Sequence, residues 1–372
     1  MAHYKISDVA IEINERENNP ANSKYERFVG LEHYVSGEVI IRNFGSTERL
    51  ESTMKVFKSG DVLVARRNVY LKRASTVDFD GLTSGDSIVL RAKTPIMARI
   101  LPFVLNTDDF WDFADQYSDG TMSKRLSPKT LMNYEFDIPD EDKLEAFADI
   151  LWAANDARES YQDLICKSDE LVKSQFIEMF ANQNFEQKTI ADLFTLQMGK
   201  TPERKEAKFW NSNDYRWISI ADLGTYGKYT ADTSEYISQT AVDQSGIKIV
   251  PKNTVIMSFK LTIGRTAITS EDIYTNEAIM AFLPKTKHFN LDYLMYALRY
   301  KDWTEGMQIA VKGATLNKNI IGKATIFIPE MRIQEEFAAF VEQSDKSKFE
   351  IKKAIENASN LIKSLMQQEF NK

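Results

Sequence analysis

The chain contains an internal repeat whose two copies are offset by 190 residues. The segment Leu171–Phe180 reads LVKSQFIEMF, and the segment Leu361–Phe370 reads LIKSLMQQEF. Upstream, the pair Ile138-Pro139 corresponds to Ile328-Pro329 at the same offset, so about 45 residues align without a gap. Such a repeat constrains the fold strongly, because both copies must build the same kind of element and bury the same kind of face.

Each copy of the repeat predicts one long helix, over residues 140–182 and 330–372. Neither Gly nor Pro occurs between Asp140 and Phe180 or between Glu330 and Lys372, and apolar residues recur every three or four positions. A helix of this size spans roughly 60 Å, so we expect the two helices to pair antiparallel as a coiled-coil spacer. The alternative is that each helix packs on its own globular domain. The residues expected in the helix–helix contact are Phe147, Leu151, Tyr161, Ile165, Val172, Phe337, Val341, Ile351, Ile355, Ile362 and Leu365.

A mixed block of strands and short helices precedes each long helix, and the two blocks correspond loosely. Val62–Ala65 matches Val255–Ser258, with the β-branched pattern of a strand that follows a turn residue. The sequence therefore predicts an α+β chain with an internal pseudo-twofold repeat. Its globular α/β domains are expected at 1–139 and 183–329, separated by the long helices at 140–182 and 330–372.

Charge and composition exclude several classes of protein. No apolar run approaches the roughly 18 residues of a membrane helix, and the first residues lack the order of a secretion signal, so we expect a cytoplasmic protein. One cysteine and three histidines make a disulfide or a zinc site improbable. The net charge of the chain is −7. Residues 140–182 alone have the same net charge, because they hold four basic and eleven acidic residues. A basic face therefore remains possible on the other segments.

Two similar but divergent domains on a spacer suit the reading of two separated features on one extended target. DNA is such a target, and the spacer would then fix the distance between two different half-sites. A scaffold that joins two protein partners would use the same geometry, and the repeat alone does not distinguish these interpretations.

The polar loops favour DNA. Residues 66–73 read RRNVYLKR, with four basic residues in eight, and Arg, Asn and Lys are the side chains that pair with bases and phosphates. The alternative is a solvated surface loop. The matching loop at 259–265 also places Lys and Arg beside a glycine, and a shared Gly-Thr segment could hold a phosphate or form a plain turn. The predicted DNA contacts are Arg66, Arg67, Asn68, Tyr70, Lys72, Arg73, Lys124, Arg125, Lys200, Lys260, Thr262, Arg265, Lys312, Thr315, Asn317 and Lys318.

Catalytic motifs are missing from the sequence. Gly199-Lys200-Thr201 is not a phosphate-binding loop, because Phe194 stands where that motif requires its first glycine. The acidic run after Pro139 suits the start of a helix better than a nuclease centre. We therefore predict a protein that binds and does not catalyse, with no catalytic residue, metal or cofactor of its own.

The order domain, helix, domain, helix, with Ile-Pro before each helix, resembles the specificity subunit of type I restriction-modification systems. Local motifs agree with this resemblance over essentially the whole chain. They are Gly199-Lys200-Thr201-Pro202, Ile263-Gly264-Arg265, Asn276-Glu277-Ala278 and Gly313-Ala314-Thr315 in the second domain, and Ala65–Tyr70 with Ser84-Gly85-Asp86 in the first.

The resemblance implies that each domain is a target recognition domain that reads one half of a bipartite double-stranded DNA sequence. It also implies that the helices set the gap and dock two methyltransferase (modification) subunits, which carry S-adenosylmethionine. Restriction subunits that use ATP and magnesium would complete the nuclease. One alternative is a related system with a fused methyltransferase-nuclease partner, and another is a duplicated protein scaffold that binds no DNA.

Overall fold

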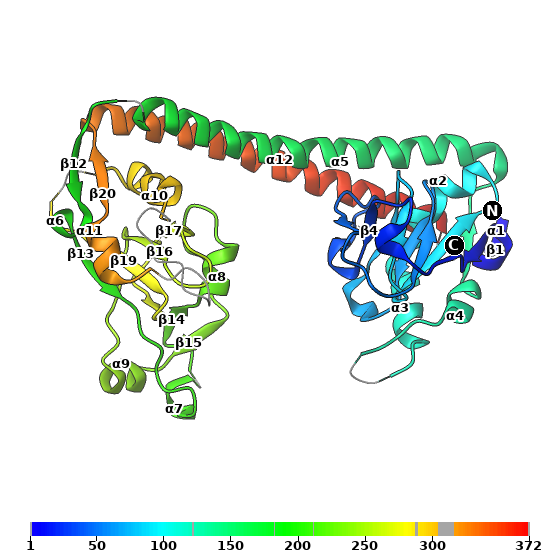
Figure 1. Cartoon of the computed structure of the whole chain (residues 1–372), viewed down its shortest axis with the longest axis horizontal. Helices are drawn as coiled ribbons and strands as arrows, with labels where there is room; N and C mark the ends of the chain where they lie inside the picture. Colours follow the sequence, from blue (N-terminus) through cyan, green and yellow to red (C-terminus); the bar gives the residue numbers. More distant parts are fainter. Residues whose placement is uncertain are drawn as a thin grey trace. The chain divides into compact units, whose positions relative to one another are not determined.

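The structure is a computed structural model that describes residues 2–120, 123–181, 183–210, 212–286, 289–303 and 316–370. The chain divides into two compact units, one formed by Met1–Leu164 with Ile351–Lys372 and the other by Ile165–Glu350. Each unit contains one α/β domain and one end of each long helix (Figure 1). The domain boundaries at residues 139, 182 and 329 stay a prediction.

The described residues of the first unit form three sheets. Its strands are β1 (Ala2–Lys5), β2 (Ala10–Ile13), β3 (Arg16–Glu17), β4 (Arg27–Val29), β5 (Gly45–Ser46), β6 (Met54–Phe57), β7 (Val62–Ala65), β8 (Ala74–Thr76), β9 (Gly81–Thr83), β10 (Ser87–Ala92) and β11 (Glu135–Ile138). Its shorter helices are α1 (Ile6–Val9), α2 (Pro95–Val104), α3 (Asp108–Gln116) and α4 (Pro128–Met132), with 3-10 turns η1 (Pro20–Asn22), η2 (Leu31–His33) and η3 (Val69–Leu71). The strand orders are β1-β11, β2-β10-β7-β8 and β3-β6-β9-β4-β5.

The second unit repeats two of these sheets. Its strands are β12 (Glu186–Thr189), β13 (Phe194–Met198), β14 (Tyr215–Ile218), β15 (Glu235–Ile237), β16 (Val255–Ser258), β17 (Thr266–Ile268), β18 (Tyr274–Thr275), β19 (Ile279–Pro284) and β20 (Thr325–Ile328). Its shorter helices are α6 (Ile190–Leu193), α7 (Ala207–Trp210), α8 (Ile220–Thr225), α9 (Gln239–Ser245), α10 (Leu291–Tyr300) and α11 (Lys318–Lys323). The order β13-β19-β16-β17 copies β2-β10-β7-β8, and β12-β20 copies β1-β11, with every pair antiparallel. In both units the third strand of the four-stranded sheet is the strand that the sequence predicted.

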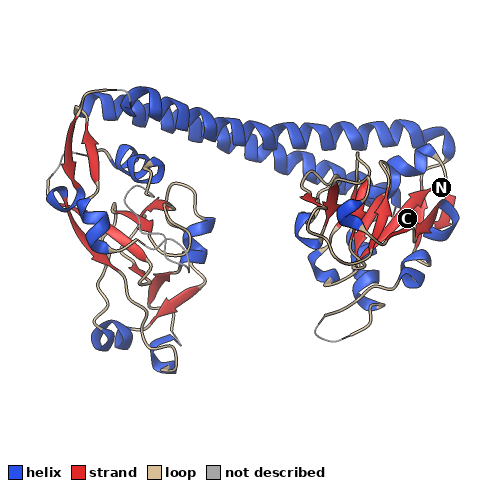
Figure 2. Ribbon diagram, viewed as in Figure 1, coloured by secondary structure: helices blue, strands red, loops and turns tan. Residues whose placement is uncertain are grey.

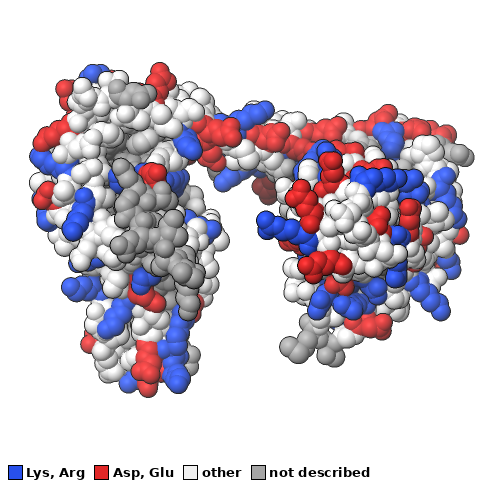
Figure 3. Space-filling view, in the orientation of Figure 1, with Lys and Arg blue, Asp and Glu red and all other residues white. Residues whose placement is uncertain are grey.

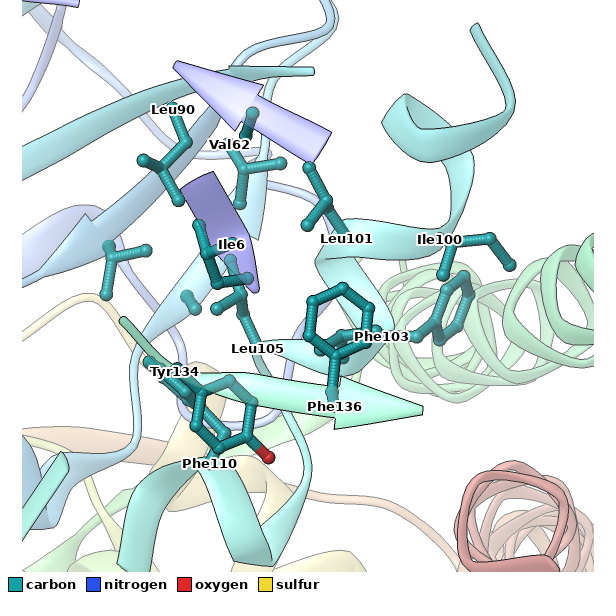
Figure 4. Close-up of a cluster of buried hydrophobic side chains, with 14 of the residues drawn as sticks. Ile6, Val62, Leu90, Ile100, Leu101, Phe103, Leu105, Phe110, Tyr134 and Phe136 are labelled. Atoms are coloured by element: carbon teal, nitrogen blue, oxygen red, sulfur yellow. The ribbon is translucent and has the colours of Figure 1, made fainter. Parts of the chain in front are cut away.

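The core of the first unit lies between the sheet of β7 and β10 and helix α2 (Figure 4). Helix α2 begins after Thr94, whose hydroxyl accepts from the backbone NH of Met97, and has a proline at its first position. Both features suit a helix start, where backbone NH groups lack partners inside the helix. Its apolar residues, Met97, Ile100 and Leu101 among them, are buried against the sheet.

The long helices are α5 (Glu141–Phe176), which continues into a π-helical turn at Ile177–Ala181, and α12 (Met331–Phe370). In Figure 2 they are the two longest blue helices, which lie side by side. The start of α5 shares the core of the first unit with the end of α12, through Phe147 and Leu151 with Met366. The end of α5 shares the core of the second unit with the start of α12, through Val172 with Phe337.

This pairing is antiparallel, as expected. Five of the eleven predicted contact residues are buried, namely Phe147, Leu151, Val172, Phe337 and Val341. The other six are half-buried, namely Tyr161, Ile165, Ile351, Ile355, Ile362 and Leu365. Polar contacts add to the seam in the second unit, where the hydroxyls of Ser168 and Ser344 are 2.8 Å apart.

Replacing Phe337 by alanine tests how far the second unit depends on the helix contact. The Phe337 ring is fully buried and meets Phe176, Phe180 and Tyr296 edge-on, with ring centroids 5.4–5.5 Å apart. We expect Phe337→Ala to lower the free energy of unfolding by about 3–5 kcal/mol in a denaturant titration. The matched control is Phe349→Ala on the same helix, where the side chain is 57% exposed and the loss is expected to stay below about 1 kcal/mol. Equal losses would contradict this account.

Candidate nucleic-acid interface

The loop between β7 and β8 lies beside a second segment of the same unit. The backbone NH of Asn68 donates to the carbonyl of Lys124 at 2.9 Å. The Ser123 hydroxyl accepts from Nε of Arg67 at 3.2 Å and donates to Oδ1 of Asn68 at 3.0 Å. The structure therefore brings together two groups of predicted DNA contacts, 66–73 and 124–125, that are distant in the sequence.

Asp86 lies between two of the predicted arginines. Its Oδ1 is 3.1 Å from Nη2 of Arg125, and its Oδ2 is 3.6 Å from Nη1 of Arg67. Both arginines are about half exposed, so they are oriented by the carboxylate while remaining open to solvent. This role of Asp86 was not predicted from the sequence, although the residue lies in the Ser84-Gly85-Asp86 motif.

Other predicted cations of this unit also have acidic partners. Nζ of Lys72 is 2.6 Å from Oδ1 of Asp108, and Nζ of Lys124 is 2.6 Å from Oδ2 of Asp115. The hydrogen bond from Lys72 holds the pKa of the Asp108 carboxyl below its usual value. On the face shown in Figure 3, basic and acidic side chains are interspersed over both units. Exposed pairs of this kind contribute little to stability, so these lysines can exchange a carboxylate for a phosphate at low cost.

Arg73 supports the loop from within. Its Nη1 donates to the carbonyl of Leu31 at 2.9 Å, and its Nη2 donates to the carbonyl of Arg67 at 3.0 Å. Burial lowers the pKa of the Arg73 guanidinium. Nε of Arg66 is buried without a hydrogen-bond partner among the described residues, and Tyr70 is 66% exposed. Among the predicted DNA contacts of this loop, Arg73 therefore supports the loop conformation, whereas Tyr70 faces solvent.

In the second unit, the motif Gly199-Lys200-Thr201 packs against the segment 275–277. The NH of Lys200 donates to the carbonyl of Thr275 at 2.8 Å, and the Thr201 hydroxyl donates to the carboxylate of Glu277. Burial raises the pKa of the Glu277 carboxyl, but hydrogen bonds from Thr201 and its own backbone, with Lys260 and Arg204 nearby, hold that pKa below its usual value.

Gly199 is required for this close approach. A Cβ atom at Gly199 would lie 2.2 Å from the carbonyl oxygens of both Thr275 and Asn276. Backbone atoms cannot move aside as a flexible side chain can. The motif is thus a structural junction between two segments far apart in the sequence, and Nζ of Lys200 donates to the carbonyl of Ser245.

The loop between β16 and β17 occupies the same place in its sheet as the β7–β8 loop does in the first unit. It contains Lys260, Thr262 and Arg265, of which Thr262 and Arg265 are exposed and Lys260 is half-buried. The Arg265 guanidinium packs so closely on Gly224 that a Cβ there would lie 2.0 Å from its Nη1. A DNA contact by these three residues stays a prediction.

Arg204 is a further cation that the sequence analysis did not select. Its guanidinium carbon lies 4.0 Å from the ring centroid of Trp210 and 4.8 Å from that of Trp217. Nη2 of Arg204 also donates to Glu235 at 3.0 Å, and this pairing raises the pKa of the guanidinium. Trp217 in turn donates from Nε1 to the carbonyl of Lys200 at 3.0 Å, so the aromatic cluster is joined to the glycine motif. The two tryptophans that follow Arg204 in the sequence, Trp210 and Trp217, could have indicated this cluster.

The last group of predicted contacts is described only in part. Lys312 and Thr315 lie outside the described residues. The Asn317 side chain caps α11, accepting from the backbone NH groups of Asn319 and Ile320 at 3.0 Å each. Lys318 is exposed at the first position of the same helix. A DNA contact by these four residues stays a prediction.

The comparisons with known proteins agree on one family. Residues 182–359 match the family model of the type I restriction modification DNA specificity domain. The specificity subunit of the type I restriction enzyme MjaIX from Methanocaldococcus jannaschii is 26% identical over 167 residues, which are 44% of this chain and 38% of that protein. Residues 182–359 of this chain are therefore similar to the DNA specificity domain of type I restriction-modification systems. The predicted resemblance is thereby confirmed, although the chain spans less than half the length of the curated relatives it matches.

Solved structures of this family share the fold. A chain from a study of complex assembly and conformational transition in the type I system has a TM-score of 0.59 at 17% identity, covering 99% of this chain and 96% of that one. The specificity subunit from M. genitalium has a TM-score of 0.51 at 14% identity, covering 100% and 96% respectively. The α+β architecture with two long antiparallel helices, predicted from the sequence, is confirmed.

No group of three or more His, Cys, Asp or Glu side chains among the described residues is arranged to hold a metal ion. Likewise, none of the helices in the described ranges is long and apolar enough to cross a membrane.

Substitution of Gly199 tests the junction beneath the second loop. We expect Gly199→Ala to lower the free energy of unfolding by about 1–3 kcal/mol, because the added methyl group meets two carbonyl oxygens. The matched control is Gly227→Ala in the same unit, where a Cβ would meet no atom within 4 Å. Thermal or denaturant unfolding measures the difference, and an unchanged Gly199→Ala variant would refute the close approach.

Proposed function

We propose that this chain is the sequence-specific DNA-binding subunit of a type I restriction-modification complex, with one half of a bipartite target read by each unit. The observation that carries the proposal is the duplicated sheet. The β7–β8 and β16–β17 loops leave the same position of the same four-stranded sheet, yet their side chains differ. To read two different half-sites, the two units need loops at corresponding positions that carry different side chains.

The long helices supply the spacing and the docking surface in this proposal. Their seam ties both repeats together, and residues 140–182 hold four basic and eleven acidic residues. Such a charge balance suits contact with protein partners better than contact with phosphates. The partners would be two methyltransferase subunits that bind S-adenosylmethionine, joined by restriction subunits that use ATP and magnesium, so that this chain provides recognition without catalysis.

Two alternatives have less support. A scaffold that binds no DNA is disfavoured by the match to a DNA specificity domain. A related system with a fused methyltransferase-nuclease would present the same recognition subunit, and only its partner would differ.

Methylation mapping tests the proposal. The chain is expressed with its methyltransferase partner in a host without such systems, and methylated adenines are mapped across the genome. We expect a split motif with a fixed gap. Arg67→Ala should relax one half of that motif, and Arg265→Ala the other half, because the two arginines lie on loops of different units.

The control for these variants is Arg49→Ala, an exposed arginine of the first unit outside the loop. It should leave both halves of the motif unchanged. Each variant must still co-purify with the partner, and removal of a phosphate contact should reduce the salt dependence of binding by about one unit of slope. Absence of methylation with the partner bound would refute the proposed function.

A further inference from the structure

Leu261, in the β16–β17 loop, is the most exposed large apolar side chain in the described part of the chain. It is 89% exposed, although burying a leucine side chain normally stabilises the folded protein. Its backbone has φ of +64°, in the left-handed region that a bulky side chain rarely occupies. A strained and exposed leucine is therefore held at the tip of a loop already predicted to contact DNA.

The loop is braced from below, so the exposure of Leu261 is built into its conformation. The fully buried Ser258 side chain donates to the carbonyl of Thr262 and accepts from the NH of Arg265 at 3.2 Å. The backbone of Ser258 also accepts from the NH of Gly264 at 3.0 Å, where φ is +86°. Backbone strain maintained by surrounding contacts is typical of functional positions.

The first unit repeats this arrangement with different residues. In the matching β7–β8 loop, Tyr70 is 66% exposed and lies between two residues with left-handed backbones, Asn68 at φ +55° and Lys72 at +47°. Ala65 stands in the place of Ser258, and the loop is braced by Arg73, which donates to the carbonyl of Arg67 at 3.0 Å. Two different sets of hydrogen bonds thus hold corresponding loops that each expose one large side chain, Leu261 in the second unit and Tyr70 in the first.

Cations flank both tips. Lys260 and Arg265 lie on either side of Leu261, and Arg67 and Lys72 lie on either side of Tyr70. An apolar side chain between cations fits duplex DNA, since the cations can contact the phosphates while the apolar group enters the stacked bases. A purely protein partner would not require this charge at both tips.

We propose that Leu261 is a wedge that inserts between two base pairs of the half-site read by the second unit, with Tyr70 as its counterpart in the first. This inference rests on the proposed function, and it describes how the second unit would deform the DNA of its half-site. Unstacking costs least at pyrimidine–purine steps, so the second half of the mapped motif should contain such a step at a fixed position.

The test uses the complex of this chain with its methyltransferase subunits and a duplex that carries the mapped motif. 2-Aminopurine replaces single bases in the second half-site, excluding the adenine that is methylated, and its fluorescence reports unstacking. We expect the wild-type complex to raise the fluorescence at one step only. Leu261→Asn, which suits a left-handed backbone, should abolish that rise and weaken binding about tenfold, whereas Leu261→Met should retain both.

Two further measurements distinguish a wedge from an ordinary contact. A mismatch placed at the same step removes most of the unstacking cost, so it should restore binding by Leu261→Asn selectively. The matched control is Ile249→Asn, at a 44% exposed apolar residue of the same unit outside the loop, which should leave fluorescence and affinity unchanged.

Other outcomes overturn the proposal. Equal fluorescence for wild type and Leu261→Asn, or no rescue by the mismatch, would show that Leu261 does not separate bases. Loss of the methyltransferase subunits from Leu261→Asn would assign the leucine to a protein interface. In both cases the wild-type complex still binds its motif and the proposed function stands, whereas a wild-type complex that binds no mapped duplex would refute both.

Discussion

The antiparallel contact between α5 and α12 closes the cores of both units. In the first unit, Phe147 and Leu151 of α5 pack in the same cluster as Met366 of α12. In the second unit, Val172 of α5 packs in the same cluster as Phe337 and Val341 of α12. Each core therefore needs a helix from the other copy of the repeat, and neither α/β domain is complete with its own repeat alone. The long helices therefore pack against each other and also form part of both cores.

The charge distribution explains how an acidic chain could still bind DNA. The acidic excess lies in residues 140–182, while the β7–β8 loop holds Arg67 and Lys72 each next to a carboxylate. Asp86 is the clearest case, because one carboxylate lies within 3.6 Å of both Arg67 and Arg125. A charge-assisted pair fixes the direction of a guanidinium, and direction is what reading a base edge demands. Local acidic partners are thus compatible with recognition, and net charge is a poor guide to it.

Sequence patterns could predict the elements that depend on local order. The strands at Val62–Ala65 and Val255–Ser258 lie at their expected residues, and helix α12 nearly fills its predicted range of 330–372. The first long helix runs without a break from Glu141 to Ala181, but its last residues, Ile177–Ala181, form a π-helical turn instead of α-helix. Periodicity predicts a helical face, but it does not reveal a change in hydrogen-bond pattern near the end of a helix.

The candidate site was harder to predict because its geometry depends on partners distant in the sequence. Arg73 was selected as a DNA contact, yet its guanidinium donates to the carbonyls of Leu31 and Arg67. The tight packing of Gly199 involves Thr275 and Asn276, which no local motif indicates. Composition can show that a loop is basic. Only the tertiary contacts show which cations stabilise the loop and which of them face solvent.

The duplicated sheet allows the two recognition loops to differ without loss of the fold. Strand β7 is fixed by β10 and β8, with Ala65 opposite Ser87, and β16 is fixed in the same way, with Ser258 opposite Ile279. The register of these ladders is set by buried residues on both faces of the sheet, so it does not depend on the loop that follows. The loop can therefore be braced by a serine in one unit and by an arginine in the other. Divergence of the reading surface on an unchanged sheet is the physical basis on which one duplicated fold could read two unlike half-sites.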